Sequence, residues 1–306
     1  MAGQRSGRVE GRSADVSTTT WRRRLLPVGV QRWGRRAYVD VGRRVPLARV
    51  TPDFVLVGGQ RCGTTSLFRA LEQHPQVVRP TFHKGINYFD LNYHRGPRWY
   101  AAHFPSAVAV RRRVPAGRRA VTFEASGYYL FHPLAVPRLA ADLPQAVVVV
   151  MLRDPVERAF SAWKHESARG FETLGFEDAL RSEPERLVGE VERMLADPTY
   201  ESFAHRHQAY RARGDYLEQL RRVLDVVPRE QVHVLYSEDF FARPEEELAR
   251  LCSTLGIPPH PGTVVERHNA RPSADMPAAA RTDLSAHFAT SRAELEALVG
   301  HPAPWP

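Results

Sequence analysis

The chain has 306 residues, a formal net charge of +9 at pH 7 and a hydrophobic fraction of 43%. This length is typical of one large α/β domain with a tail, and the apolar residues suffice for a core. The positive charge suits an anionic ligand. Because the sequence has no zinc-finger spacing, helix-turn-helix signal or RNP-like aromatic stretch, we expect no nucleic-acid partner.

Two further features concern the location of the protein. Cys62 and Cys252 are too few for a disulfide framework, and they favour a reducing compartment. No stretch approaches the ~20 apolar residues that a membrane-spanning helix needs. Residues 25–30 are also too short for the apolar segment of a signal peptide. We therefore expect a cytoplasmic protein without a transmembrane segment.

The chain is predicted to begin with a basic extension, residues 1–50, followed by one folded domain, residues 51–306. Residues 1–20 are rich in Gly, Ser, Thr and Arg, a composition typical of a disordered leader. Residues 21–49 are arginine-dense with scattered aromatic side chains. This part is a solvated extension, an arm packed on the domain, or a contact for an anionic surface.

The first motif of the domain is residues 54–71, FVLVGGQRCGTTSLFRAL. The short apolar run 54–57 predicts a buried parallel strand, and glycines then precede a helical pattern. A helix that starts after a strand and a glycine loop offers free N–H groups and the positive end of its dipole to an anion. The spacing of Gly58 and Gly63 is that of a nucleotide-binding P-loop, but Thr64 follows instead of lysine. The loop cation is Arg61, and the hydroxyl donors are Thr64, Thr65 and Ser66.

Two alternatives remain open in this loop. It is either an anion site or a tight turn with chance hydroxyls. Cys62 is either a small loop residue or a thiol whose pKa is lowered by its position.

Residues 83–90, HKGINYFD, follow a possible short strand at residues 77–78. His83 has the intrinsic pKa of a general base, whereas Lys84 needs desolvation or a cationic neighbour to lose its proton. A surface loop with incidental charges is the alternative.

Residues 97–104 predict a short helix, and residues 108–119 a basic excursion with a turn. Glu124 ends a predicted strand, residues 120–124, where open α/β sheets place ligands. An ion pair with an arginine is the alternative for this carboxylate.

The second anchor is residues 146–155, AVVVVMLRDP. Its β-branched run predicts a central parallel strand buried on both faces. Asp154 is suited to cap a helix that starts at Pro155, so Arg153 lies at the end of the strand. Ser161, two helical turns later, can reach back toward that end. The alternative is a capped helix with a surface arginine.

The remaining sequence predicts further helices and one more strand. Residues 188–213 are polar and helical, and we expect residues 200–210, with His205 and His207, to flank the cleft. These two histidines point to different faces without a third ligand, so we expect no metal site. Residues 214–224 and 244–255 predict amphipathic helices, and residues 232–236 a strand. Residues 267–272 form a basic loop before the last helix.

These motifs resemble those of sulfotransferases that use 3′-phosphoadenosine 5′-phosphosulfate (PAPS). They are most similar to the Golgi heparan-sulfate group, whose loop reads roughly G-x-Q-K-x-G-T-T-x-L, with Arg61 in place of the lysine. The resemblance covers roughly residues 52–275. It implies an α/β fold with a P-loop-like parallel sheet flanked by helices. It also implies transfer of a sulfuryl group from PAPS to a hydroxyl or amine.

The resemblance also implies where the cofactor binds. The loop would hold the 5′-phosphosulfate, with Arg61 neutralising the bridging oxygen. Arg153 and Ser161 would hold the 3′-phosphate. Arg267 and Arg271 are positional analogues of a family loop that covers the cofactor. The implied cofactor-binding residues are Gly59, Gln60, Arg61, Cys62, Gly63, Thr64, Thr65, Ser66, Arg153, Ser161, Arg267 and Arg271.

The catalytic base is where this chain departs from the family, whose segment runs K-E-x-x-F-F. Gly85 occupies the position of the family glutamate that deprotonates the acceptor. The catalytic candidates are then Arg61, Lys84 as a stabiliser of the sulfuryl group, and His83 or Glu124 as the base.

The resemblance favours a carbohydrate, glycolipid or glycosylated metabolite as the acceptor. Two other functions remain open: a P-loop kinase-like phosphotransferase, and a non-catalytic binder of PAPS or its product, adenosine 3′,5′-bisphosphate (PAP). A kinase needs a loop lysine and a carboxylate that holds magnesium, and the loop lysine is missing.

Overall fold

The computed structural model describes residues 28–45, 47–268 and 275–305. The predicted leader, residues 1–20, and Arg271 lie outside the described residues. The expected boundary at residue 50 stays a prediction.

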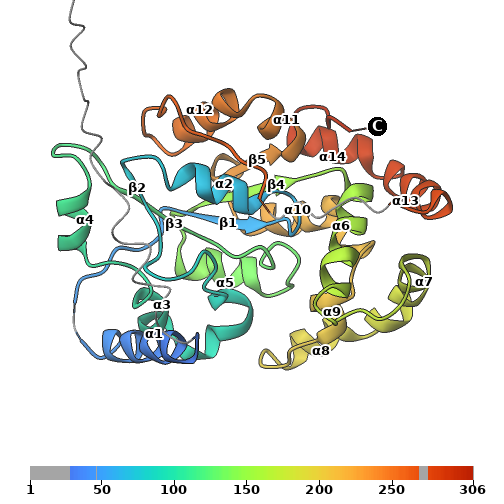
Figure 1. The fold of residues 1–306 in the computed structure, drawn as a ribbon, viewed down its shortest axis with the longest axis horizontal. Coiled ribbons are helices and arrows are strands. Elements are labelled where there is room, and N and C mark those ends of the chain that lie inside the picture. The colour runs from blue at the N-terminus through green and yellow to red at the C-terminus, as the bar shows by residue number, and fades with distance from the viewer. Residues whose placement is uncertain (1–27, 46, 269–274, 306) are drawn as a thin grey trace, which may run out of the picture.

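A five-stranded, all-parallel sheet forms the centre of the domain (Figure 1). Its strand order is β2-β3-β1-β4-β5. The strands are β1 (Phe54–Gly58), β2 (Val77–Val78), β3 (Val121–Ala125), β4 (Val147–Leu152) and β5 (Val232–Tyr236). Phe54 pairs with Phe123 on one side and with Val147 on the other. Every residue of β1 and β3 is buried, as expected for strands covered on both faces. The predicted α/β class and all five predicted strands are confirmed.

Helices cover both faces of this sheet (Figure 1). The connection from β1 to β2 crosses the sheet in one direction, and the connection from β3 to β4 crosses it in the other. Because such crossovers are right-handed, their helices α2 (Thr64–Leu71) and α5 (Ala135–Asp142) lie on opposite faces. In Figure 1, α2, α11 (Ser237–Ala242) and α12 (Pro244–Thr254) lie above the strands and α5 below. The chain therefore reverses its direction between β1 and β4, which is the switch point where open α/β sheets bind ligands.

A second hydrophobic cluster lies beside the sheet. It is built by α6 (Pro155–Ser167), α7 (Phe176–Leu187) and α13 (Ala278–Ala289). The other helices are α1 (Val28–Gly42), α3 (Pro97–Ala101), α4 (Ala107–Arg113), α8 (Glu190–Ala196), α9 (Phe203–His207), α10 (Tyr216–Leu224) and α14 (Arg292–Val299). None of the described helices is both long enough and apolar enough to cross a membrane.

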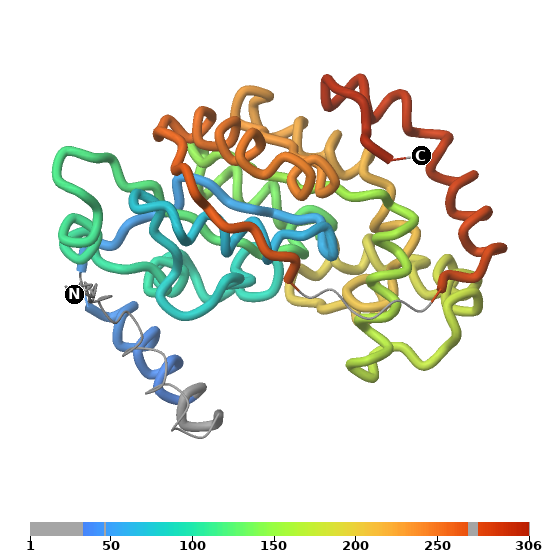
Figure 2. The backbone as a smooth tube through the Cα atoms, turned by 45° about the horizontal axis from the view of Figure 1, so that its top comes forward, coloured from blue at the N-terminus to red at the C-terminus, as the bar shows by residue number. Residues whose placement is uncertain are grey.

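Part of the basic extension packs on the domain. Helix α1 projects from one end of the body (Figure 2), and its C-terminal part contacts the domain, with Val39 buried and the Tyr38 ring 5.0 Å from that of Phe82. Arg49 donates a hydrogen bond of 2.5 Å to the carbonyl of Phe104. Of the three alternatives for residues 21–49, the described part corresponds to the packed arm.

Two local predictions differ from the structure. The basic excursion predicted at residues 108–119 begins with helix α4, which the sequence did not indicate. The Ser106 side chain caps this helix by accepting from the Ala109 N–H at 3.2 Å. The predicted helical stretch 188–213 is broken between α8 and α9. Asp197 accepts from the Thr199 N–H at 2.9 Å, and Pro198 cannot continue the helical hydrogen bonds.

Candidate functional site

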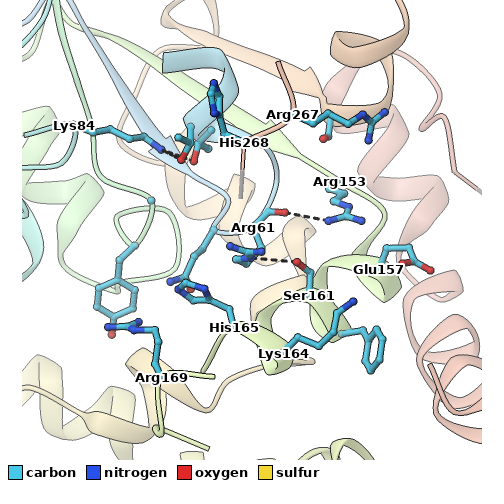
Figure 3. Close-up of a pocket in the computed structure, with 18 of the residues that line it drawn as sticks. Arg61, Lys84, Arg153, Glu157, Ser161, Lys164, His165, Arg169, Arg267 and His268 are labelled. Carbon is cyan, nitrogen blue, oxygen red and sulfur yellow. Dashed lines mark hydrogen bonds between the residues drawn. The ribbon is translucent and has the colours of Figure 1, made fainter. Parts of the chain in front are cut away.

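A cavity of about 670 Å³ opens at the carboxyl ends of β1 and β4 (Figure 3). The loops that follow these two strands meet there, at the switch point of the sheet. The lining residues from these loops and the nearby segments are Gln60, Arg61, Gly63, Thr64, Thr65, Lys84, Asn87, Tyr128, Arg153, Ser161 and Arg267.

The loop between β1 and α2 is shaped by its glycines. Gly63 precedes α2 with φ of 90°, a conformation that side chains disfavour. A Cβ at this position would come within 3.2 Å of both Met151 and Phe241, so the site requires glycine sterically as well. Arg61 also has a positive φ, 72°. The loop thereby turns into α2 and presents the start of that helix to the cavity.

Lys84 closes one side of this loop. Its Nζ donates to the Thr64 hydroxyl at 2.9 Å and to the Thr65 hydroxyl at 3.1 Å. Burial, together with the charge of Arg69, lowers the pKa of Lys84 to about 7. The structure thus supplies both conditions under which this lysine can lose its proton near neutral pH.

The second anchor meets the first on the other side of the cavity (Figure 3). Asp154 caps α6 by accepting from the Val156 N–H at 2.9 Å. Ser161 then faces the loop, and its Oγ accepts from Arg61 Nε at 3.2 Å. Arg153 Nη1 donates to the carbonyl of Arg61 at 3.5 Å. The fold therefore brings these three predicted residues together, although Arg61 and Ser161 are 100 positions apart in the sequence.

The two predicted bases do not line the cavity. His83 is exposed outside it. Glu124 is fully buried, and its carboxylate accepts four hydrogen bonds, from Ile86 N–H, Tyr100 OH, Ser126 OH and Tyr129 OH. Burial raises the pKa of Glu124 to about 7. This carboxylate anchors the segment that carries Lys84, and it is not the partner of an arginine ion pair.

Gly85, at the position of the family glutamate, is packed tightly against the end of β3. A Cβ there would lie 3.0 Å from the carbonyl oxygen of Ala125 and 3.1 Å from Ser126 Oγ. A larger side chain therefore requires the end of β3 to move.

Three predicted cofactor residues are not among those that line the cavity: Gly59, Cys62 and Ser66. Burial raises the pKa of the Cys62 thiol to about 11, despite the nearby charge of Arg158, so the thiol is a packed loop residue. Ser66 Oγ accepts from the His268 N–H at 3.0 Å. This contact ties the basic loop to α2 and places Arg267 in the cavity, where its guanidinium lies 4.3 Å from the centre of the Phe241 ring.

Several cavity residues were not identified from the sequence. Lys164 carried the clearest signal, because the chain has only two lysines, and both line the cavity. Four lining residues lie in segments that the sequence indicated, without being named as site residues: Asn87, Arg206, His207 and His268. Gly127 and Tyr128 closely follow the predicted strand that ends at Glu124. The other missed residues carry no motif: Glu157, Phe160, His165, Arg169, Ser237, Glu238 and Phe241.

The cavity is strongly cationic. Its arginines and lysines are Arg61, Lys84, Arg153, Lys164, Arg169, Arg206 and Arg267, against two carboxylates, Glu157 and Glu238. In Figure 3, Arg267 and His268 lie at one end, and Lys164, His165 and Arg169 at the other. Within the described ranges, no group of His, Cys, Asp or Glu side chains is arranged to hold a metal ion. The site suits a ligand with several negative charges.

Comparisons with known proteins agree with this site. The model of a family described as "Sulfotransferase family" matches residues 52–261. The membrane-associated sulfotransferase kil1 of Dictyostelium discoideum is 26% identical over 272 residues, covering 67% of this chain and 56% of that protein. The human bifunctional heparan sulfate N-deacetylase/N-sulfotransferase 2 is 28% identical over 216 residues, covering 68% of this chain and 22% of that protein. The chain thus spans about half the length of the first relative and about a fifth of the second.

One solved structure is similar over nearly its whole length. The sulfotransferase from Alicyclobacillus acidocaldarius is 32% identical, with a TM-score of 0.62. The alignment covers 83% of this chain and 98% of that one.

Proposed function

This chain belongs to the sulfotransferase family, and on that basis we propose that it transfers a sulfuryl group from PAPS to a hydroxyl or amine. The observation that carries the proposal is the convergence of two strand-end motifs on one cationic cavity. Arg61 follows β1, whereas Arg153 and Ser161 follow β4. Arg61 hydrogen-bonds to both of them, through its Nε to Ser161 and through its carbonyl to Arg153.

The residues present fit PAPS by their chemistry. The start of α2 and the hydroxyls of Thr64 and Thr65 are donors for the 5′-phosphosulfate. Arg153 and Ser161 offer a charged and a neutral donor to the 3′-phosphate. The stacked Arg267 and Phe241 offer a flat surface at the far end.

PAPS supplies the sulfuryl group, and PAP departs with the bridging oxygen. Arg61 would neutralise the negative charge that grows on that oxygen, a preorganised electrostatic contribution. Lys84, held on Thr64 and Thr65, would stabilise the group in transfer. Arg153 and Ser161 keep the nucleotide in place, because the 3′-phosphate does not change during the reaction.

The other end of the cavity is proposed to bind the acceptor. Lys164, Arg169 and Arg206 lie there and are not needed for the phosphates of the nucleotide. Their charge favours an acidic carbohydrate or another anionic glycosylated acceptor, which agrees with the names of the heparan sulfate relatives. We include a cytoplasmic location in the proposal, because Cys62 and Cys252 are both free thiols.

A binder of PAPS that has lost its catalysis is the second candidate, favoured by Gly85 at the family base position. The test has two parts. Calorimetric titration with PAP and with ATP should show clearly tighter binding of PAP, and tighter ATP binding would contradict the proposal. Incubation with [³⁵S]PAPS and de-N-sulfated heparan sulfate, glycolipids or simple glycosides should label an acceptor. PAP binding without any transfer or sulfate release, even to water, would favour the binder.

A further inference from the structure

Sulfuryl transfer to a hydroxyl or an amine needs a group that takes the proton of that acceptor. The three positions considered so far do not supply it. Gly85 has no side chain, His83 lies outside the cavity, and Glu124 is buried with four donors on its carboxylate.

A histidine and a carboxylate from two different helices pair at the acceptor end of the cavity. His207 Nδ1 lies 3.0 Å from Glu166 Oε2. Glu166 is only 3% exposed, on α6, whereas His207 is the last residue of α9 and lines the cavity. The His207 ring packs against those of Phe171 and Phe203, with ring centres 4.5 and 5.0 Å away.

The charge state of Glu166 sets the histidine tautomer. Burial alone would raise the pKa of Glu166, but the hydrogen bond from His207 and the charges of Arg169 and His165 lower it overall. Glu166 is therefore a carboxylate at neutral pH and can only accept, so Nδ1 of His207 carries the hydrogen. Nε2 of a neutral His207 then keeps its lone pair, as in other histidine–carboxylate pairs.

The other titratable groups of the cavity are less suited to this role. Lys84 is held on the hydroxyls of Thr64 and Thr65 at the phosphosulfate loop, where its proposed role is to stabilise the group in transfer. Glu157 is paired with Arg281 at 2.7 Å. Glu238 accepts from the Asp154 N–H, beside Arg153. His268 lies with Arg267 at the nucleotide end (Figure 3). His165 lies 3.9 Å from Glu166, beyond hydrogen-bonding distance, and is the nearest rival.

We propose that His207 is the general base that accepts the proton of the acceptor, and that Glu166 is the residue that positions it. This inference rests on the proposed function. As the acceptor oxygen or nitrogen bonds to sulfur, the bond from sulfur to the bridging oxygen breaks and its electron pair stays with PAP. The acceptor proton moves to Nε2 of His207, and Glu166 stabilises the imidazolium until the proton leaves to water.

Hydrogen bonds of Arg213 link the segment that carries His207 to the phosphosulfate loop. Arg213 is buried, and it donates to the carbonyls of His205 and Arg206 and to the side chain of Gln60. The end of α9 is thereby fixed relative to the loop that holds the donor, as a base acting on an acceptor beside that loop requires.

The pair predicts a specific pH dependence. The charged and titratable groups beside the pair are His165 and Arg169, which lie against Glu166, and Arg206, which precedes His207 in α9. Because a general base must be unprotonated to accept a proton, the turnover rate should fall at low pH. Glu166→Gln removes the anion that stabilises the imidazolium, so the acid limb should move to lower pH. A purely structural role for Glu166 does not produce this shift.

The experiment measures [³⁵S]sulfuryl transfer to an acceptor that the wild-type protein labels, or sulfate release to water if no acceptor is found. PAP binding is measured alongside. His207→Gln should lower kcat on the order of 10²–10⁴ and leave PAP affinity within about twofold. Exogenous imidazole should partly restore His207→Ala, as it would not for a packing defect. His94→Gln, an exposed histidine outside the cavity, is the matched control.

The outcomes separate this inference from the proposed function. Unchanged kcat in His207→Gln would overturn the inference. The proposed function would still stand, because the wild-type protein would be active. Loss of kcat in His165→Gln with normal His207→Gln would assign the base to His165 instead. A wild-type protein that neither binds PAP nor releases sulfate would reject the function, and with it the inference.

Discussion

Arg61 and Arg153 share one cavity but are proposed to act at different stages. Arg61 should act where charge develops, so Arg61→Ala is expected to lower kcat on the order of 10²–10³ with a smaller effect on KM. Arg61→Lys keeps a point charge and should retain substantial activity. Steady-state kinetics with PAPS tests this. Because residue 61 has a positive φ, a substitution there can affect folding, and thermal melting of each variant is the control. A rise in KM at unchanged kcat would show that the loop only binds.

Arg153 contacts the part of the ligand that does not react. Arg153→Ala should weaken PAP binding by roughly 1.5–3 kcal/mol, the usual range for a charge-assisted contact, and change kcat little at saturation. Calorimetry with PAP measures the first effect. Adenosine 5′-phosphate, which lacks the 3′-phosphate, is the matched ligand, and it should bind both proteins alike. If Arg153→Ala lost the same affinity for both ligands, Arg153 would not be the residue that binds the 3′-phosphate.

Lys84 makes PAP binding depend on pH. Its pKa in the free protein is lowered to about 7, and a bound anion favours the charged form. Below pH 7 the lysine is already charged. Above pH 7 binding must first take up a proton, so affinity should fall as pH rises. Calorimetry in buffers of different ionisation enthalpy should detect proton uptake at pH 8, and Lys84→Met should lose it. Unchanged uptake in this variant would place the titrating group elsewhere.

At the scale of one element, the N-terminus of α6 orients Ser161 toward Arg61. Asp154 caps this helix through the amides of Val156 and Glu157. Asp154→Ala should lower the free energy of unfolding by about 1 kcal/mol, whereas Asp154→Asn, which can still cap, should cost much less. Urea denaturation of both variants measures this. Equal losses would show that the charge of Asp154, rather than its capping, stabilises the helix.

At the scale of the whole molecule, the second hydrophobic cluster is joined to the site by a close contact. A Cβ on Gly214 would lie 2.5 Å from Phe288 Cζ and 3.2 Å from Pro155 Cβ. Phe288 belongs to α13, and Pro155 begins α6. The packing of α13 therefore bears directly on the helix that carries Ser161 and Glu166.

This contact can be tested by a double-mutant cycle. Gly214→Ala must displace Phe288 and should destabilise the protein by roughly 1–3 kcal/mol, the range for overpacking. Phe288→Ala should cost about 3 kcal/mol by leaving a cavity. In the Phe288→Ala background, Gly214→Ala should cost clearly less, because most of the clash is gone. Additive losses in urea denaturation would contradict the contact.

The sequence by itself determined the parts whose physics is local. The β-branched run 146–152 is a buried strand wherever it folds, and Asp154 with Pro155 starts a helix from those two residues alone. The glycine loop with Arg61, Thr64 and Thr65 likewise indicates an anion site within a dozen positions. The five strands, the parallel sheet and the family were therefore all predictable.

Only the tertiary structure decided which ionisable groups reach the cavity. Lys84 and Glu124 were equal catalytic candidates in the sequence, yet Lys84 lines the cavity and Glu124 is buried behind it. His207 meets Glu166 across 41 positions, and neither belongs to a motif. Proton affinity and access depend on burial and on partners from distant segments, because charges interact through space and not along the chain. These properties arise when the helices pack around the sheet.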